Sequence, residues 1–80
     1  ENSITIYPNP AVDQVNFSIG GNAVIDRLYP QVKLYSAEGA FLGTFPTNKP
    51  LNVSGLSEGL YILKFTGKGS KEEHKLFLKR

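Results

Sequence analysis

The chain has 80 residues, which is enough for one small domain with a limited hydrophobic core. It contains no cysteine, so disulfide bonds are excluded and the usual thiolate ligands of structural metals are absent. The net charge is +2, but six of the nine Lys and Arg residues lie in residues 64–80, against two of the seven acids. This basic end could meet nucleic acid, acidic lipid or an acidic receptor, or it could form the solvated face of a final hairpin.

Apolar and polar residues alternate with a period of two, and turn residues interrupt the alternation about every 8 to 12 positions. The first predicted strand contains Ile4 and Ile6 and stops at Pro8, because proline cannot donate a hydrogen bond to a strand ladder. The second covers residues 15–19, has one wet face, and ends at the glycine pair that follows it.

Residues 22–30 are ambiguous, because their apolar side chains could form either a helical turn or a loop that carries the chain across a sandwich. The third predicted strand contains Val32 and Leu34. We expect a hairpin turn after this strand, in which Gly39 supplies the positive φ that such turns need.

The fourth predicted strand ends before Pro46 and is marked by Phe41 and Phe45 on one face, or by Leu42 on the other. Three more strands and one glycine-rich turn follow, with the strands at residues 51–53, 61–66 and 74–79 and the turn at residues 67–70. Seven short strands without a helical period predict an all-β protein. We expect an immunoglobulin-like antiparallel β-sandwich of about seven strands.

The pattern Leu56-x-x-Gly59-x-Tyr61 is typical of a tyrosine corner, in which a tyrosine hydroxyl bonds to backbone a few residues upstream. Gly59 would allow the tight turn, Leu56 would fill the core, and Tyr61 would bury its ring. Because this corner occurs in unrelated sandwiches, it indicates a fold and says nothing about function.

No set of residues predicts catalysis, a metal site or a cofactor site. His74 is the only histidine and lies in an alternating strand, so we interpret it as a partly buried structural residue. Glu72 and Glu73 are adjacent, and a strand would point them to opposite faces, so they cannot act as a pair. Calcium between loops remains an open alternative without any recognisable ligand spacing.

Exposed aromatic residues offer an alternative function, because sugar-binding sandwiches use aromatic rings as stacking platforms. By the alternation, Tyr29, Tyr35 and Phe77 are expected to face outward. The same outward aromatics are common on small β domains, where they pair across strands. The alternative is therefore a non-catalytic carbohydrate- or ligand-binding module attached to a secreted enzyme.

The edge strands of an open sandwich are usually kept from pairing with other chains by charged residues, prolines or bulges, and two strands here have few of these features. The fourth strand contains Gly43 and little charge, and the last strand is apolar on both faces at residues 76–78. Such a strand suggests pairing with a partner strand, either in a homodimer or in a receptor. The other interpretation places this strand inside a sheet, covered on both faces.

Several segments, taken in order, resemble one known family. They are Tyr7-Pro8-Asn9-Pro10 and the strand after it, then residues 32–39, 51–65 and the basic final strand 75–80. Together they resemble the C-terminal sorting domain of proteins exported by the type IX (Por) secretion system of Bacteroidota. The resemblance covers nearly the whole chain.

The resemblance implies that residues 1–80 are a single sorting domain at the end of a larger cargo protein. The cargo would pass through the periplasm and cross the outer membrane, to be secreted or displayed at the cell surface. The implied partners are an outer-membrane translocon, a shuttle protein and a sortase, which removes the domain by cleavage near Glu1. The resemblance implies no nucleic acid binding, no direct membrane insertion and no cofactor.

Carried over to this chain, the resemblance assigns recognition to two segments and fold-setting roles to others. The recognition residues are Gly59, Leu60, Tyr61, Lys75, Leu76, Phe77, Leu78, Lys79 and Arg80. The fold-setting residues are Tyr7, Pro8, Pro10, Leu56, Gly59 and Tyr61. An apolar strand flanked by cations could add to a sheet edge and complement an acidic receptor.

Overall fold

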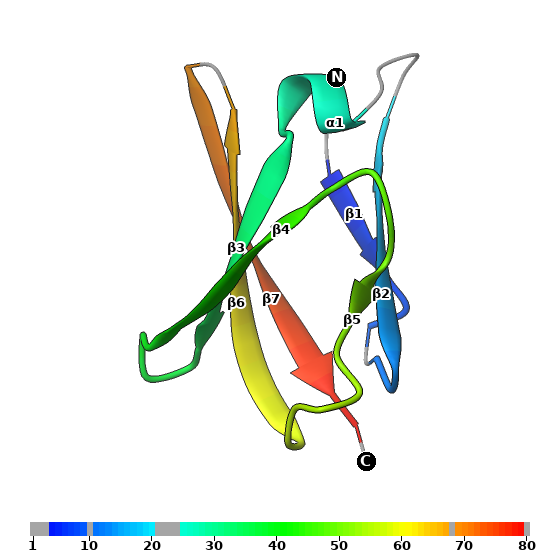
Figure 1. The fold of residues 1–80 in the computed structure, drawn as a ribbon, viewed down its shortest axis with the longest axis vertical. Coiled ribbons are helices and arrows are strands. Elements are labelled where there is room, and N and C mark those ends of the chain that lie inside the picture. Colours follow the sequence, from blue (N-terminus) through cyan, green and yellow to red (C-terminus); the bar gives the residue numbers. More distant parts are fainter. Residues whose placement is uncertain (1–3, 10, 21–24, 68, 80) are drawn as a thin grey trace.

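The computed structural model describes residues 4–9, 11–20, 25–67 and 69–79, and within them seven strands form two antiparallel sheets (Figure 1). The smaller sheet has the order β1-β2-β5, with β1 at Ile4–Tyr7, β2 at Gln14–Ile19 and β5 at Leu51–Asn52. The larger sheet has the order β4-β3-β6-β7, with β3 at Gln31–Ser36, β4 at Phe41–Pro46, β6 at Gly59–Gly67 and β7 at Ser70–Leu78. The predicted all-β sandwich is confirmed.

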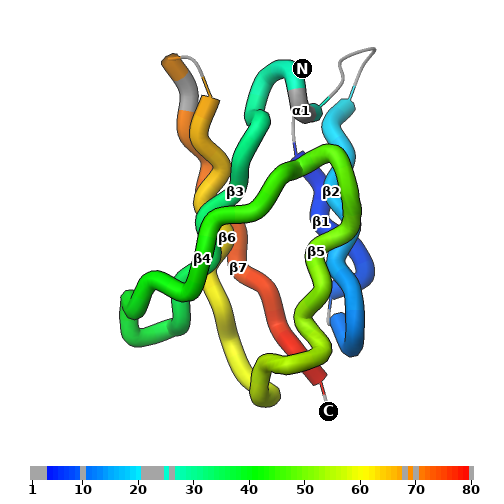
Figure 2. The backbone as a smooth tube through the Cα atoms, in the orientation of Figure 1, coloured from blue at the N-terminus to red at the C-terminus, as the bar shows by residue number. Residues whose placement is uncertain are grey.

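The chain changes sheet three times, which gives the Greek-key connectivity of immunoglobulin-like sandwiches. It leaves β2 for β3 through the short helix α1 (Ile25–Leu28), which resolves the ambiguous segment as a helical turn over those four residues. Residues 22–24 of that segment lie outside the described residues. Figure 2 shows the second crossing clearly, where the green backbone passes from β4 to β5. The third crossing joins β5 to β6.

The core lies between the sheets and is built from the inward positions that the alternation predicts. Phe65 is fully buried at its centre, and three rings meet it edge-on. The centroid distances are 5.4 Å to Phe17, 6.4 Å to Tyr29 and 5.6 Å to His74. Edge-to-face contacts of this kind add to the stability that apolar burial provides.

The fourth strand differs from its prediction, because Phe41 and Phe45 lie on opposite faces. Phe45 pairs with buried Val32 and is half-buried against the core, whereas Phe41 pairs with Tyr35 on the outer face. The register shifts between these pairs, so that Leu42 is an extra residue in β4. A bulge of one residue exchanges the two faces of a strand, and a simple count along the sequence cannot detect it.

Tyr29 also differs from its prediction. It was expected to face outward, but it is 6% exposed. Its backbone N–H donates to the carbonyl of Ile25, and the hydroxyl of buried Thr47 donates to the Tyr29 carbonyl at 2.5 Å. Tyr29 lies between α1 and β3 and belongs to no strand, so the alternation of strand residues does not apply to it.

The tyrosine corner is confirmed. The hydroxyl of Tyr61 donates to the Ser57 carbonyl at 2.8 Å, and Leu56 packs against the core. Gly59 has a φ of 147°, which residues with a side chain rarely adopt. The corner fixes where the chain crosses from β5 into β6.

Strand β7 is an edge strand, so the interpretation that placed it inside a sheet is wrong. Strand β4 forms the opposite edge of the same sheet, as the sequence suggested. Among the described residues, no helix has the length and apolar character to cross a membrane.

Candidate functional site

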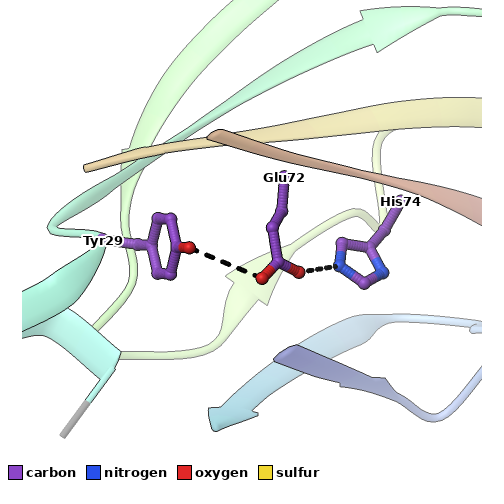
Figure 3. A network of polar contacts seen from close by, with 3 residues as sticks. All are labelled: Tyr29, Glu72 and His74. Atoms are coloured by element: carbon purple, nitrogen blue, oxygen red, sulfur yellow. Dashed lines mark hydrogen bonds and ion pairs between the residues drawn. The ribbon is translucent and has the colours of Figure 1, made fainter. Parts of the chain in front are cut away.

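The most chemically suggestive cluster is formed by Tyr29, Glu72 and His74 (Figure 3). The Tyr29 hydroxyl donates to Glu72 Oε2 at 3.4 Å, and His74 Nε2 lies 3.0 Å from Glu72 Oε1. The carboxylate thus holds both partners, and the hydroxyl contacts the carboxylate and not the imidazole that would have to activate it. The cluster therefore lacks the geometry of an activated nucleophile.

His74 contacts both Glu72 and the core. Its side chain is 27% exposed, and its ring meets Phe65, which confirms the predicted partial burial, while its structural role stays a prediction. Glu73 points to the opposite face from Glu72, also as predicted. Over the part of the chain that the structure describes, no three His, Asp or Glu residues are grouped to hold a metal ion.

The predicted recognition residues divide between the two faces of the larger sheet. Tyr61, Leu76 and Leu78 are buried in the core, so a partner cannot touch their side chains without unfolding the strand. Leu60, Lys75, Phe77 and Lys79 point outward, because neighbouring residues of a strand face opposite sides. Arg80 lies outside the described residues.

The outward residues join others that the sequence analysis missed. The register sets Leu60 opposite Phe77 and, two residues further along β6, Ile62 opposite Tyr35, which in turn pairs with Phe41. These residues form an apolar row across four strands, which we call the outer apolar patch: Phe41, Tyr35, Ile62, Leu60 and Phe77. The side chains at its two ends, Phe41 and Phe77, are 56% and 54% exposed.

Lysines share the face of the outer apolar patch. On the same face, strands β3, β6 and β7 and the residue after β7 carry what we call the lysine border: Lys33, Lys64, Lys71, Lys75 and Lys79. Lys64 Nζ lies 4.7 Å from the centroid of the Tyr35 ring, in a cation–π contact. Lys64 pairs with Lys33 on β3 and with Glu73 on β7, so the unfavourable pairing of two like charges is offset by an acid on the other side of Lys64.

The outer face of the smaller sheet has a different character. Its outward side chains in β1, β2 and β5 are uncharged, mostly hydroxyls and amides: Thr5, Tyr7, Gln14, Asn16, Ser18 and Asn52. Among the described strand residues, outward aromatic rings and lysines therefore occur together on the larger sheet and not on the smaller one.

Asn9, which lies between the two prolines of the opening motif, binds the edge of β7. Asn9 Oδ1 accepts the Phe77 N–H at 3.0 Å, and Asn9 Nδ2 donates to the Lys75 carbonyl at 3.1 Å. Ala11 continues the contact as a parallel bridge: its N–H donates to the Phe77 carbonyl, and its carbonyl accepts the Lys79 N–H, each at 2.8 Å. The sequence analysis missed Asn9, although the flanking prolines, which cannot donate, leave its amide as the conspicuous polar group.

The opening motif is otherwise on the surface. Tyr7 and Pro8 are exposed, and Pro10 lies outside the described residues, so their fold-setting role stays a prediction. The hydrogen bonds to β7 are made by Asn9 and Ala11. The Tyr7 carbonyl does accept a bond from Asn16 in β2 at 3.3 Å.

A shallow depression at the tyrosine-corner end has a volume of about 540 Å³ and is lined by all three residues of the Gly59–Tyr61 segment. Its walls also carry Glu38 and Glu58, but no accessible aromatic platform, because the Tyr61 ring is buried. Since Tyr29 is buried as well, only Tyr35 and Phe77 of the three expected stacking residues lie on an outer face.

Comparison with known proteins gives one finding. A family model described as "Secretion system C-terminal sorting domain" matches residues 5–79, which is nearly the whole chain and includes both the Asn9 segment and β7. No curated protein matches the chain.

Proposed function

Because the chain belongs to the family of type IX secretion C-terminal sorting domains, we propose that it is the last domain of a larger cargo protein and carries that cargo from the periplasm across the outer membrane. The family's domains are sorting signals for secreted or cell-surface proteins and work with the type IX machinery in general. The finer steps are our proposal. The domain is recognised by the outer-membrane translocon and a shuttle protein and is then cut off by a surface sortase.

The single observation that carries the proposal is the match of the family model from residue 5 to residue 79. The chemistry of the described residues agrees with a recognition role, since the Tyr29–Glu72–His74 cluster lacks the geometry of an activated nucleophile and the distinctive surface is an exposed apolar row accompanied by lysines. In this proposal the domain itself performs no catalysis and is a substrate of the sortase.

The test is a transfer experiment. A periplasmic reporter is fused to the N-terminus of residues 1–80 and expressed with a signal peptide in a bacterium that has type IX secretion. We expect the reporter at the cell surface or in the medium, without the domain. The reporter alone, and the fusion in a strain without the translocon, should stay in the periplasm. Retention of the intact fusion in the competent strain would contradict the proposal.

Deleting the last strand is a poor test of recognition. Leu76 and Leu78 are 0% and 1% exposed, so a deletion of residues 75–80 removes core side chains and is expected to unfold the sandwich. A loss of export in such a variant would not separate recognition from folding. Substitutions of outward residues, whose side chains do not build the core, make this separation.

A further inference from the structure

We propose that the outer face of the β4-β3-β6-β7 sheet, comprising the outer apolar patch and the lysine border, is the surface that docks on an acidic protein of the export machinery. This inference rests on the proposed function and specifies its recognition step. It replaces the addition of a partner strand to the chain end by docking of a sheet face.

The first argument is that the end of β7 offers little free backbone for strand addition. The Lys75 carbonyl, both backbone polar groups of Phe77 and the Lys79 N–H are bonded to Asn9 or Ala11. A partner strand could pair there only by displacing the segment that carries Asn9. Main-chain pairing gives strand addition its affinity, and at this edge the pairing is already made within the domain.

The second argument is the exposure of large apolar side chains. Phe41 in β4 and Phe77 in β7 are each more than half exposed, and Tyr35, Ile62 and Leu60 connect them across the sheet as half-buried neighbours. Aromatic anchors surrounded by residues that exclude water are typical of the centre of a protein–protein interface. In this row the two exposed rings lie at the ends, and the half-buried side chains between them make the apolar strip continuous.

The third argument is charge. The charged residues at the outward positions of β3, β6 and β7 and at the residue after β7 are five lysines and one acid, Glu73, which pairs with Lys64. The net positive charge of this face would steer an acidic partner to it and away from the uncharged face of the smaller sheet.

The shape of the surface favours a protein partner over an anionic membrane. Segments that lie in a membrane surface concentrate apolar side chains on one face that sinks below the headgroups. Here three members of the row are half-buried within a four-stranded sheet, and Lys64 and Lys75 lie beside Tyr35 and Ile62 on the same face. Apolar and charged side chains that share one face of a sheet fit an opposing protein surface better than a surface that sinks below the headgroups.

The test compares two triple variants of the full reporter fusion that change the net charge equally. One is Lys33→Gln/Lys64→Gln/Lys75→Gln on the outer face of the larger sheet. The control is Thr5→Glu/Gln14→Glu/Ser18→Glu on the outer face of the smaller sheet. We expect surface display to fall at least tenfold in the lysine variant and to stay within twofold of the unchanged fusion in the control. Thermal unfolding of both purified domains verifies that each is folded.

A second pair of variants tests the apolar row. Phe41→Ser/Phe77→Ser removes its two exposed ends, and Val12→Ser/Leu28→Ser removes two exposed apolar side chains from other parts of the surface. We expect the first variant to lose display and the second to keep it. Normal display of both the lysine variant and the phenylalanine variant would overturn the docking face, while the sorting function would stand as long as the unchanged fusion is displayed.

Two further measurements distinguish an acidic protein from the other possible partners of this face, a membrane and a second copy of the chain. Lysine-dependent sedimentation of the purified domain with phosphatidylglycerol vesicles would assign the face to a membrane surface and overturn the proposal. Dimerisation in analytical ultracentrifugation that is abolished by Phe41→Ser/Phe77→Ser would assign it to a second copy of this chain and overturn it too. Absence of both, together with the loss of display described above, supports an acidic protein partner. If the unchanged fusion is not displayed at all, the proposed function itself fails.

Discussion

The side-chain amide of Asn9 accepts the backbone N–H of Phe77 at 3.0 Å, across 68 positions of the chain. The same amide donates to the Lys75 carbonyl, so it forms the two bonds that a peptide group of a neighbouring strand would form. The opening motif and the final strand, which are separate features in the sequence, are therefore one structural unit. Asn9 holds the strand that carries Phe77 on the outer face.

The first prediction concerns this contact. Asn9→Ala removes two exposed hydrogen bonds, each with a net value of about 1 kcal/mol or less, and we expect a loss of about 1 kcal/mol in the free energy of unfolding. Native-state hydrogen exchange should show faster exchange of the Phe77 amide. The amide of Leu78, on the side of β7 that pairs with β6, should change much less.

Two variants control this prediction. Asn9→Asp keeps an acceptor for Phe77 but loses the donor to Lys75, so an intermediate effect is expected. Asn48→Ala changes an exposed asparagine elsewhere and should leave the Phe77 amide unaffected. Unchanged exchange of the Phe77 amide in Asn9→Ala would contradict the proposed role of Asn9 at the edge of β7.

The second prediction concerns the tyrosine corner. Tyr61→Phe keeps the buried ring and removes the hydroxyl that donates to Ser57 at 2.8 Å. We expect the free energy of unfolding in urea to fall by about 1 kcal/mol, because the Ser57 carbonyl loses its partner. The matched control is Tyr35→Phe, which keeps the ring beneath Lys64 and should change stability by less than about 0.5 kcal/mol. Equal losses of stability in the two variants would contradict a stabilising role of the bond between Tyr61 and Ser57.

The third prediction concerns close packing at the end of β6. A Cβ on Gly67 would overlap the Leu28 carbonyl oxygen, whereas a Cβ on Gly55 would meet open space. We expect Gly67→Ala to reduce the free energy of unfolding by about 1 to 3 kcal/mol, since α1 or the hairpin has to shift. Gly55→Ala should stay within about 0.5 kcal/mol of the unchanged chain. Thermal or urea unfolding of the two variants decides between these expectations.

The fourth prediction tests the polar cluster as a purely structural contact. His74→Phe keeps an aromatic ring against Phe65 and removes the contact with Glu72, whose side chain is 30% exposed. Partly exposed pairs of this kind contribute less than about 1 kcal/mol, so stability should change little. Surface display of the reporter fusion should also be unchanged. A folded variant that is no longer displayed would assign a functional role to the cluster.

Much of the fold could be predicted because it follows from local chemistry. The alternation identified the strands, and the buried residues of β3 and β6 are the ones that it indicated. The glycine turn at Gly39, with its positive φ of 94°, and the tyrosine corner also depend on short stretches of chain. In contrast, the bulge at Leu42 and the burial of Tyr29 arise from how one segment meets another. No count along a single strand contains that information.

The sequence by itself determined the class of fold, the family and the presence of a basic, apolar final strand, because these are properties of residue order. Only the tertiary structure decided which of those residues a partner can reach. Pairing of distant strands buries Leu76 and Leu78, brings Phe41 and Phe77 onto one face, and lets Asn9 cover the end of the β7 edge. A surface assembled from four strands is set by their register, and register depends on contacts between residues far apart in the chain.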